Sequence, residues 1–239
     1  MYTRIIGDIH GKVTDYKFYS LGIGRTRSSK EIPVERSIQI GDFGMGFNKN
    51  PYWNDNMHQW FEANPGHRFI RGNHDDPAIC KTMPGYIPDG RVEGSTMFIG
   101  GAWSIDHAWR TAGVNWWADE ECSIEQFNQM LDTYAIVRPR VMITHDCPTQ
   151  AAIDIFQNRG LLWGGRDAKL ENTRTASALQ AMFEIHQPDI HIFGHWHHTV
   201  LEKIGNTYFM CLGELDYIDI DLDNIEESQK LMIAKVAAK

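Results

Sequence analysis

Short apolar runs alternate with longer segments of mixed polarity along most of the chain. Each run holds four to six residues, many of them β-branched, and is bounded by polar residues or glycine, as is typical of a short buried strand. The runs predict strands at residues 3–6, 37–40, 68–71, 96–99, 140–144, 189–193, 200–204, 207–212 and 217–222. Gly205 and Asn206 predict the tight turn of a hairpin near the C-terminus.

Three segments between these runs have the length and periodicity of helices, at residues 52–63, 123–134 and 173–186. Ser123 and Gln126 have the spacing of a capping box at the start of the second segment. The third segment ends before Pro188, because proline disfavours a helical residue in front of it. The Gly-, Arg- and Ser-rich stretch 12–35 is predicted to be a mobile loop. This alternation indicates the α/β class, with sheets inside and helices outside.

The chain has 239 residues, enough for one domain with a large buried core. We predict that domain at residues 1–222 and a charged C-terminal tail, forming a surface helix, at residues 223–239.

The four cysteines are far apart and form no CxxC pair, which indicates a reducing environment without disulfides. No apolar run approaches the roughly 18 residues that cross a bilayer, and no signal peptide is recognisable. We therefore expect a cytoplasmic protein without a membrane partner.

The charge balance bears on the choice of partner. The chain has 23 Lys and Arg against 31 Asp and Glu, a formal net charge of −8. Tight binding to the phosphates of nucleic acid needs clustered basic residues, so we do not expect an extended nucleic acid as partner. A small or local nucleotide substrate is compatible with this charge.

Polar residues whose side chains can bind ligands or take part in reactions directly follow five of the predicted strands. Ligands of α/β sheets bind outside the carboxyl ends of the strands, so the topology brings these five segments to one edge. The segments are Gly7-Asp8-Ile9-His10-Gly11, Gly41-Asp42, Gly72-Asn73-His74-Asp75, Thr144-His145-Asp146 and Gly194-His195-Trp196-His197.

The residue types in these segments predict a metal site. Aspartate and neutral histidine are oxygen and nitrogen donors suited to Mn²⁺, Fe, Zn²⁺ or Co²⁺. Asp8 and His10 are two residues apart, so both side chains point the same way in an extended segment. His195 and His197 repeat this spacing, and Asp42 stands alone after its strand, where it could bridge two ions.

The five segments, in this order, resemble the sequence pattern of calcineurin-like metallophosphoesterases over residues 4–197. The resemblance implies a sandwich of two mixed β-sheets flanked by helices, with a dinuclear metal centre. Mn²⁺ is the expected metal, with Fe, Zn²⁺, Co²⁺ or Ni²⁺ as alternatives. The implied ligands are Asp8, His10, Asp42 and His197 for one ion, and Asp42, Asn73, His145 and His195 for the other.

The same resemblance implies metal-dependent hydrolysis of phosphoester bonds, in which the two ions activate a bridging water. His74 would be the catalytic histidine, and Asp75 is the carboxylate closest in sequence that could orient it. We expect a phosphomonoesterase acting on a phosphoprotein, a nucleotide or another phosphorylated small molecule. A phosphodiesterase acting on cyclic nucleotides or nucleic-acid ends is the alternative, and a metal-bound binding module without catalysis is a third hypothesis.

The second segment departs from the Ser/Thr protein phosphatase branch of this family. That branch has the pattern GDxxDRG, whereas Asp42 is followed here by Phe43-Gly44-Met45-Gly46, without the phosphate-binding arginine. Arg71, in front of Gly72, does match the RGNH of that branch. Arg71 is therefore a candidate for substrate binding, with capping of its strand as the other interpretation.

Residues 100–121 resemble a stretch, GGAxSID…WR…WW…E, of bacterial and phage metallophosphoesterases with poorly defined substrates. We predict an aromatic loop at the rim of the site. Arg110 is suited to bidentate contact with phosphate, or it pairs with Asp106 or a glutamate. His107 is a candidate to face the substrate. The tryptophans of this loop either pack it onto the sheet or stack on a ring of the substrate: Trp109, Trp116 and Trp117.

Other histidines and cysteines are assigned to packing. His191 lies inside the predicted strand 189–193. We expect it to be a core histidine whose ring has hydrogen-bond partners. Cys147 lies two residues after His145 but lacks the partner set of a nucleophile, so we expect it to pack.

Overall fold

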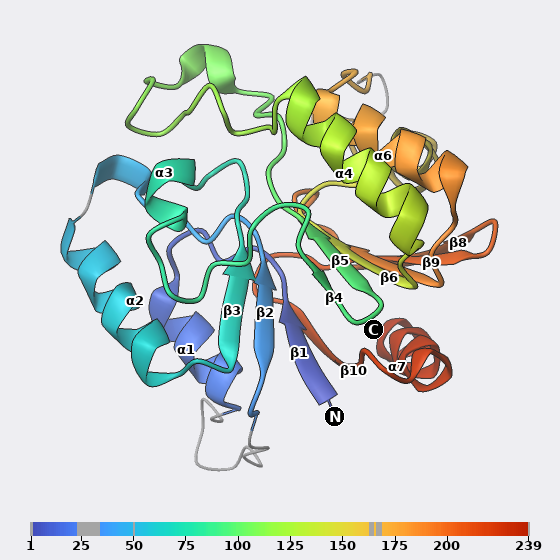
Figure 1. The fold of residues 1–239 in the computed structure, drawn as a ribbon, viewed down its shortest axis with the longest axis horizontal. Coiled ribbons are helices and arrows are strands. Elements are labelled where there is room, and N and C mark those ends of the chain that lie inside the picture. Colours follow the sequence, from blue (N-terminus) through green and yellow to red (C-terminus); the bar gives the residue numbers. More distant parts are fainter. Residues whose placement is uncertain (1, 23–33, 50, 163–164, 166–168, 239) are drawn as a thin grey trace.

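Two mixed β-sheets pack face to face in the computed structural model, which describes residues 2–22, 34–49, 51–162, 165 and 169–238 (Figure 1). The first sheet has the strand order β10-β1-β2-β3. Strands β1, β2 and β3 are parallel, and β10 runs antiparallel to β1. Their bounds are Tyr2–Ile6 (β1), Ser37–Ile40 (β2), His67–Ile70 (β3) and Tyr217–Asp221 (β10).

The second sheet has the order β4-β5-β6-β7-β9-β8. Its four central strands are parallel, and the edge strands β4 and β8 are antiparallel to their neighbours. The β8–β9 hairpin turns through Gly205 and Asn206, as the sequence predicts. The bounds are Val92–Glu93 (β4), Thr96–Ile99 (β5), Val141–Thr144 (β6), Ile190–Phe193 (β7), Val200–Ile204 (β8) and Thr207–Cys211 (β9).

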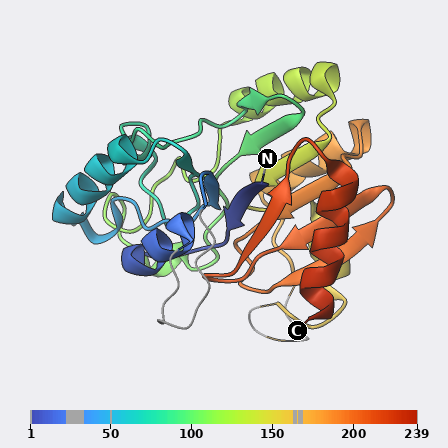
Figure 2. The ribbon, with the colours of Figure 1, turned by 90° about the horizontal axis from the view of Figure 1, so that it is seen from below.

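Helices cover the outer faces of the sandwich, which confirms the predicted α/β layering. Helices α1 (Val13–Leu21) and α2 (Pro51–Ala63) lie on the first sheet, and α4 (Ile124–Val137) and α6 (Arg174–Ile185) on the second (Figure 1). Helix α7 (Ile225–Ala237) packs beside β10 (Figure 2). Shorter helical segments are Phe47–Lys49, α3 (Pro77–Cys80), His107–Trp109, α5 (Thr149–Ala152) and the π-helix Ile153–Gln157. None of the helices in the described ranges is long and apolar enough to cross a membrane.

The apolar runs of the sequence form the core between the two sheets. Ile5 and Ile38 of the first sheet belong to the same buried cluster as Ile143 and Ile192 of the second, and each is at most 1% exposed. Burying apolar surface from both sheets in one layer is the main stabilising contribution to such a fold. The loops that leave the strands are therefore carried on a rigid base.

Helix α1 corrects the prediction of a loop at its position. The segment has no clear amphipathic periodicity, and Lys12 makes no capping hydrogen bond with its side chain. The helix depends instead on tertiary contacts, because the buried Tyr16 ring packs 4.7 Å from Phe43 and 5.3 Å from Trp60 between ring centroids. Gly22 ends it in the left-handed conformation, with φ 68°. Residues 23–33 of the predicted loop lie outside the described residues.

Helix α4 begins with the predicted capping box. The Ser123 hydroxyl accepts from the Gln126 amide, and the Gln126 side chain accepts from the Ser123 amide. At the other end of the chain, Ile225 and Met232 of α7 are buried in the core cluster. The division into a domain at 1–222 and a tail at 223–239 stays a prediction.

His191 generates a prediction about stability. Its ring is 2% exposed, bonds the Thr144 hydroxyl at 2.7 Å, and has its pKa lowered to about 3 by burial. Between pH 6.5 and pH 3 the unfolded chain binds a proton there that the folded chain does not, so acid destabilises the fold by about 1.4 kcal/mol per pH unit from this residue. His191→Gln should flatten the dependence of urea-unfolding free energy on pH in that window. Identical pH slopes for the metal-stripped variant and parent would contradict this.

Candidate metal centre

The carboxyl ends of β1, β2, β3, β6 and β7 bring all seven predicted ligands to one edge of the sandwich. Two groups of side chains converge there, and the donor atoms that they offer lie within 4.8 Å of one another in each group. The first ligand group is Asp8, His10, Asp42 and His197. The second ligand group is Asp42, His145 and His195, joined by the amide oxygen of Asn73.

Asp42 belongs to both groups and presents a different oxygen to each. Its Oδ1 lies 3.2 Å from Nε2 of His145, and its Oδ2 lies 3.8 Å from Nε2 of His10. The residue has φ 53°, a left-handed conformation that costs a non-glycine residue energy and is typical of functional sites. Gly72 allows this placement, because a Cβ there would collide with the backbone nitrogen and Oδ1 of Asp42.

The second ligand group turns acceptor atoms toward one another. His145 Nδ1 donates to the carbonyl oxygen of Ile40 at 2.9 Å, so a neutral ring presents a lone pair at Nε2. That Nε2 faces Asp42 Oδ1 and, at 3.1 Å, Asn73 Oδ1, which also lies 3.0 Å from Nδ1 of His195. These acceptor atoms all gain a favourable partner only when a positive charge, either a proton or a metal ion, lies among them.

The first ligand group has the same character. Nε2 of His197 lies 3.2 Å from Asp8 Oδ2 and 3.0 Å from Nε2 of His10, so two imidazole nitrogens and a carboxylate meet at one point. Asp8 is fully buried and is held by the backbone amide of His195 at 3.1 Å. His10 and His197 have φ 43° and φ 55°. Mixed nitrogen and oxygen donors of this kind fit a first-row divalent metal.

Electrostatics at the centre favour a cation. Burial opposes ionisation of Asp42, but His145 holds the pKa of that carboxyl well below its usual range. Burial likewise opposes a charge on His145, yet Asp42 raises its pKa to about 10. Burial lowers the pKa of His195 to about 3, which leaves that ring neutral and able to act as a ligand.

Asp75 does not orient His74, contrary to the role predicted from its position in the sequence. Its buried carboxylate accepts from the backbone amides of Gly72 at 2.7 Å, Phe43 at 3.1 Å, Gly44 at 2.7 Å and Met45 at 2.7 Å. Asp75 therefore ties the loop after β3 to the loop after β2. Neighbouring residues on a tight turn point in different directions, and sequence adjacency did not reveal this.

Arg110 is the side chain that contacts His74. Its Nη2 donates to Nε2 of His74 at 2.6 Å and pairs with Asp106 Oδ1 at 2.6 Å, with the arginine side chain only 7% exposed. Burial is the main cause that lowers the pKa of His74, and the Arg110 charge adds to it. The structure thus shows the Arg110–Asp106 pair, and it brings Arg110 to the centre as well. Contact between Arg110 and a substrate stays a prediction.

The other two predicted substrate-binding residues make contacts of a different kind. The Arg71 guanidinium is buried, pairs with Asp89 at 2.8 Å, and donates to the backbone oxygen of Glu120 at 2.6 Å. These contacts favour the structural interpretation of Arg71. His107 is exposed in the rim loop, where Nδ1 lies 3.0 Å from the Ser104 carbonyl oxygen.

The rim tryptophans divide between packing and exposure. Trp117 is buried, with its ring centroid 6.2 Å from that of Phe47, and Trp116 lies 6.2 Å from His107. Trp109 is 80% exposed. The packing interpretation therefore holds for Trp117, and the exposed Trp109 remains open to a ligand.

Asp146 is a positioning residue that the sequence did not reveal. Its buried Oδ1 accepts from the indole nitrogen of Trp196 at 3.1 Å, and the Trp196 ring stacks on Phe156 at 4.4 Å between centroids, tilted by 6°. Trp196 stands between the ligands His195 and His197. One carboxylate next to His145 thus connects the ligand-bearing loops of β6 and β7.

Asp75→Asn should weaken both the fold and metal binding. An amide keeps one acceptor oxygen and turns an NH₂ group toward backbone amides, which leaves buried donors unpaired at a cost of about 2 kcal/mol or more. Asp76→Asn is the matched control, because asparagine caps helix α3 as well as aspartate does. Urea unfolding and Mn²⁺ titration of both variants test this, and equal stability of the two variants would contradict it.

Metal binding should release a proton from His145. With its pKa at about 10, this ring is protonated at neutral pH in the metal-free protein, and a metal ligand must be deprotonated. Calorimetric titration of Mn²⁺ at pH 7, repeated in buffers of different ionisation enthalpy, should give about one proton more per ion than His145→Gln gives. Equal proton release in the two proteins would show that His145 is already neutral.

No protein-family model matches the chain, and no curated protein matches it. Solved structures do match. A conserved protein from Streptococcus pneumoniae, described as a predicted phosphoesterase, aligns over 92% of this chain and 84% of its own, at 14% identity and a TM-score of 0.36. A protein described as the anchor in the inner membrane complex of Plasmodium aligns over 89% of this chain and 71% of its own, at 10% identity and a TM-score of 0.49.

A Staphylococcus aureus protein, provisionally described as a 5′-nucleotidase, matches with a TM-score of 0.50 at 13% identity. The match covers 92% of this chain and 50% of that protein, so the chain spans about half the length of this relative. At such identity the likeness concerns the fold alone. Together with the two mixed sheets and the flanking helices, it shows that the chain adopts the calcineurin-like metallophosphoesterase fold.

Proposed function

We propose that the chain hydrolyses phosphate monoesters with the help of two divalent cations. The observation that carries this proposal is the sharing of Asp42 between two groups of metal-ligand atoms, with His74 beside the shared carboxylate. Nε2 of His74 lies 3.9 Å from Asp42 Oδ2, so a phosphate held at the centre would be within its reach. The fold, and its likeness to the Staphylococcus aureus protein provisionally described as a 5′-nucleotidase, support the same chemistry.

The two ligand groups would hold the cations, and we propose Mn²⁺ as the metal. When bound, such ions activate water as a nucleophile and neutralise charge on phosphate oxygens. The chain contributes a preorganised frame, since Asp42, His10 and His197 are already fixed in left-handed conformations. Buried Asp8 and His145 exclude water from the inner side of the centre.

Arg110 and His74 form the second part of the proposal. In the structure Arg110 donates to Nε2 of His74, so the ring is neutral and carries its proton on Nδ1. A phosphate oxygen near Arg110 would compete for that donor and free Nε2. His74 would then take up a proton from solvent water at Nε2 and transfer it to the leaving oxygen, while the Arg110 charge stabilises the phosphate.

The proposed substrates are phosphorylated small molecules, nucleotides or phosphoproteins. With a net charge of −8, the chain is not expected to offer the basic surface that a long nucleic acid needs. Arg110 and the metal centre could still bind a single phosphate group. We assign Arg71 to the structural role rather than to substrate binding, because its guanidinium is buried against Asp89 and the backbone.

Hydrolysis of nitrophenyl phosphate and bis(nitrophenyl) phosphate by metal-stripped protein, with Mn²⁺ added back, tests the proposal. We expect metal-dependent turnover with a preference for the monoester. His74→Ala should lower kcat by about 10²- to 10⁴-fold, the usual contribution of general acid catalysis, and retain bound metal. His58→Ala, on α2 beside Glu62, is the control and should keep full activity.

The outcomes separate the hypotheses. A preference for bis(nitrophenyl) phosphate would replace the monoesterase by a phosphodiesterase. Metal binding without turnover of either ester, and without any effect of His74→Ala on a biological readout, would indicate a binding module. Asp42→Asn should lose metal binding and turnover together, because the variant removes one charge from both ligand groups.

A further inference from the structure

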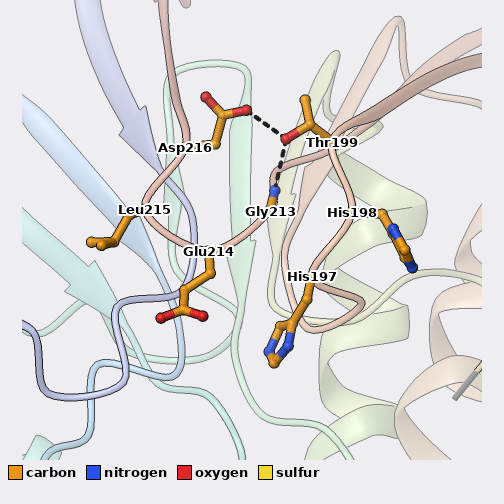
Figure 3. Close-up of a pocket in the computed structure, with 7 residues that line it drawn as sticks. All are labelled: His197, His198, Thr199, Gly213, Glu214, Leu215 and Asp216. Atoms are coloured by element: carbon orange, nitrogen blue, oxygen red, sulfur yellow. Dashed lines mark hydrogen bonds between the residues drawn. The ribbon is translucent and has the colours of Figure 1, made fainter.

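The metal centre continues into an open pocket of about 500 Å³ between the β7–β8 and β9–β10 loops (Figure 3). His197 of the first ligand group lines this pocket together with Thr199, Glu214, Leu215 and Asp216. Because His197 belongs to both, one molecule can place its phosphate at the centre and another part in the pocket. The sequence patterns did not single out any of the other four residues.

The acidic side chains of the pocket are already neutralised. Asp216 accepts from Lys235 Nζ at 2.6 Å and from the Thr199 hydroxyl at 2.5 Å, and Glu214 forms an ion pair with Lys12. A cationic ligand therefore meets no excess negative charge. A neutral ligand with hydroxyl groups fits better, since a carboxylate has about four lone-pair sites and one partner leaves the others available.

The side chains are arranged for such a ligand. Glu214 and His197 extend to the same side of the pocket, away from the hydrogen bond between Asp216 and Thr199 (Figure 3). Both are accessible, with side-chain exposures of 34% for Glu214 and 49% for His197. Leu215 points away from these two side chains and packs against the buried cluster that contains Ile6 and Phe43 (Figure 3). Hydroxyl donors of a ligand could therefore reach the exposed part of the Glu214 carboxylate.

We propose that this pocket is a subsite for the sugar of a phosphorylated substrate, in which Glu214 accepts hydrogen bonds from neighbouring hydroxyl groups. An acidic side chain on the hydroxyls of ribose is a recurring solution in nucleotide recognition. The inference rests on the proposed phosphomonoesterase function and names its substrate class: a sugar phosphate or nucleotide. A phosphoprotein offers no such hydroxyl pair.

The test compares ribose 5-phosphate, nitrophenyl phosphate and a phosphoserine peptide as substrates of the Mn²⁺-loaded protein. We expect the highest kcat/KM for ribose 5-phosphate. Glu214→Ala should lower the ratio of kcat/KM for ribose 5-phosphate over nitrophenyl phosphate about tenfold, the loss of one hydrogen bond to a charged group. The ratio cancels any change that freeing Lys12 imposes on both phosphates.

Two variants sharpen the comparison. Glu214→Gln keeps one acceptor oxygen and should lower the ratio by less than Glu214→Ala does. Glu202→Gln is the matched control, because Glu202 is also a glutamate of an exposed ion pair, with Arg159 on another part of the surface. That variant should leave the ratio unchanged.

A binding measurement separates the subsite from the chemistry. Saturation-transfer NMR with methyl riboside and metal-stripped protein should give a riboside signal that Glu214→Ala abolishes. Turnover of nitrophenyl phosphate with an unchanged ratio in Glu214→Ala overturns the subsite and leaves the phosphatase standing. If no ester is hydrolysed, the proposed phosphatase function is overturned. The riboside signal then tests the sugar subsite by itself. A signal that disappears in Glu214→Ala supports the subsite, and the absence of any signal with the parent protein overturns it.

Discussion

The carboxylate of Asp42 is the constraint on which the rest of the site depends. It is 1% exposed, and its two oxygens face different histidines, one in each ligand group. An ionised carboxylate at such depth is stable only among donors and positive charge. The backbone amide of His74 provides one hydrogen bond at 2.8 Å, and His145 provides a charge or, when neutral, leaves the position to a cation. A metal ion bound here would therefore couple metal affinity to the stability of the fold.

Other buried carboxylates hold the ligand loops in place without touching a ligand atom. Asp75 collects backbone amides from the loops of β2 and β3, and Asp146 holds Trp196 between His195 and His197. Both connect loops that leave different strands. Such connections fix the distance between ligands to within the tolerance that a metal centre needs, which strands alone cannot do because their ends are free to diverge.

The rim loop is anchored at its base and reaches the centre at its tip. Arg71 donates to the carbonyl oxygen of Glu120, and Glu121 accepts from the backbone amide of Thr175 at the start of α6. From this base the loop extends Arg110 back to His74. The pocket with Glu214 is lined by His197, which belongs to the loop after β7. Under the proposed function, chemistry and substrate choice would belong to different loops on one rigid sandwich.

The sequence by itself determined nine of the described strands, the order of the ligand-bearing segments and the α/β class, but it missed the two-residue edge strand β4. These follow from local patterns: apolar runs of four to six residues, and glycine next to Asp42 or His195 where the chain must turn. Only the tertiary structure decided which groups meet, as with Asp75 on backbone amides, Arg110 on His74 and helix α1 under its aromatic neighbours. These contacts join residues far apart in the chain, and their geometry depends on how the two sheets pack, which no local pattern encodes.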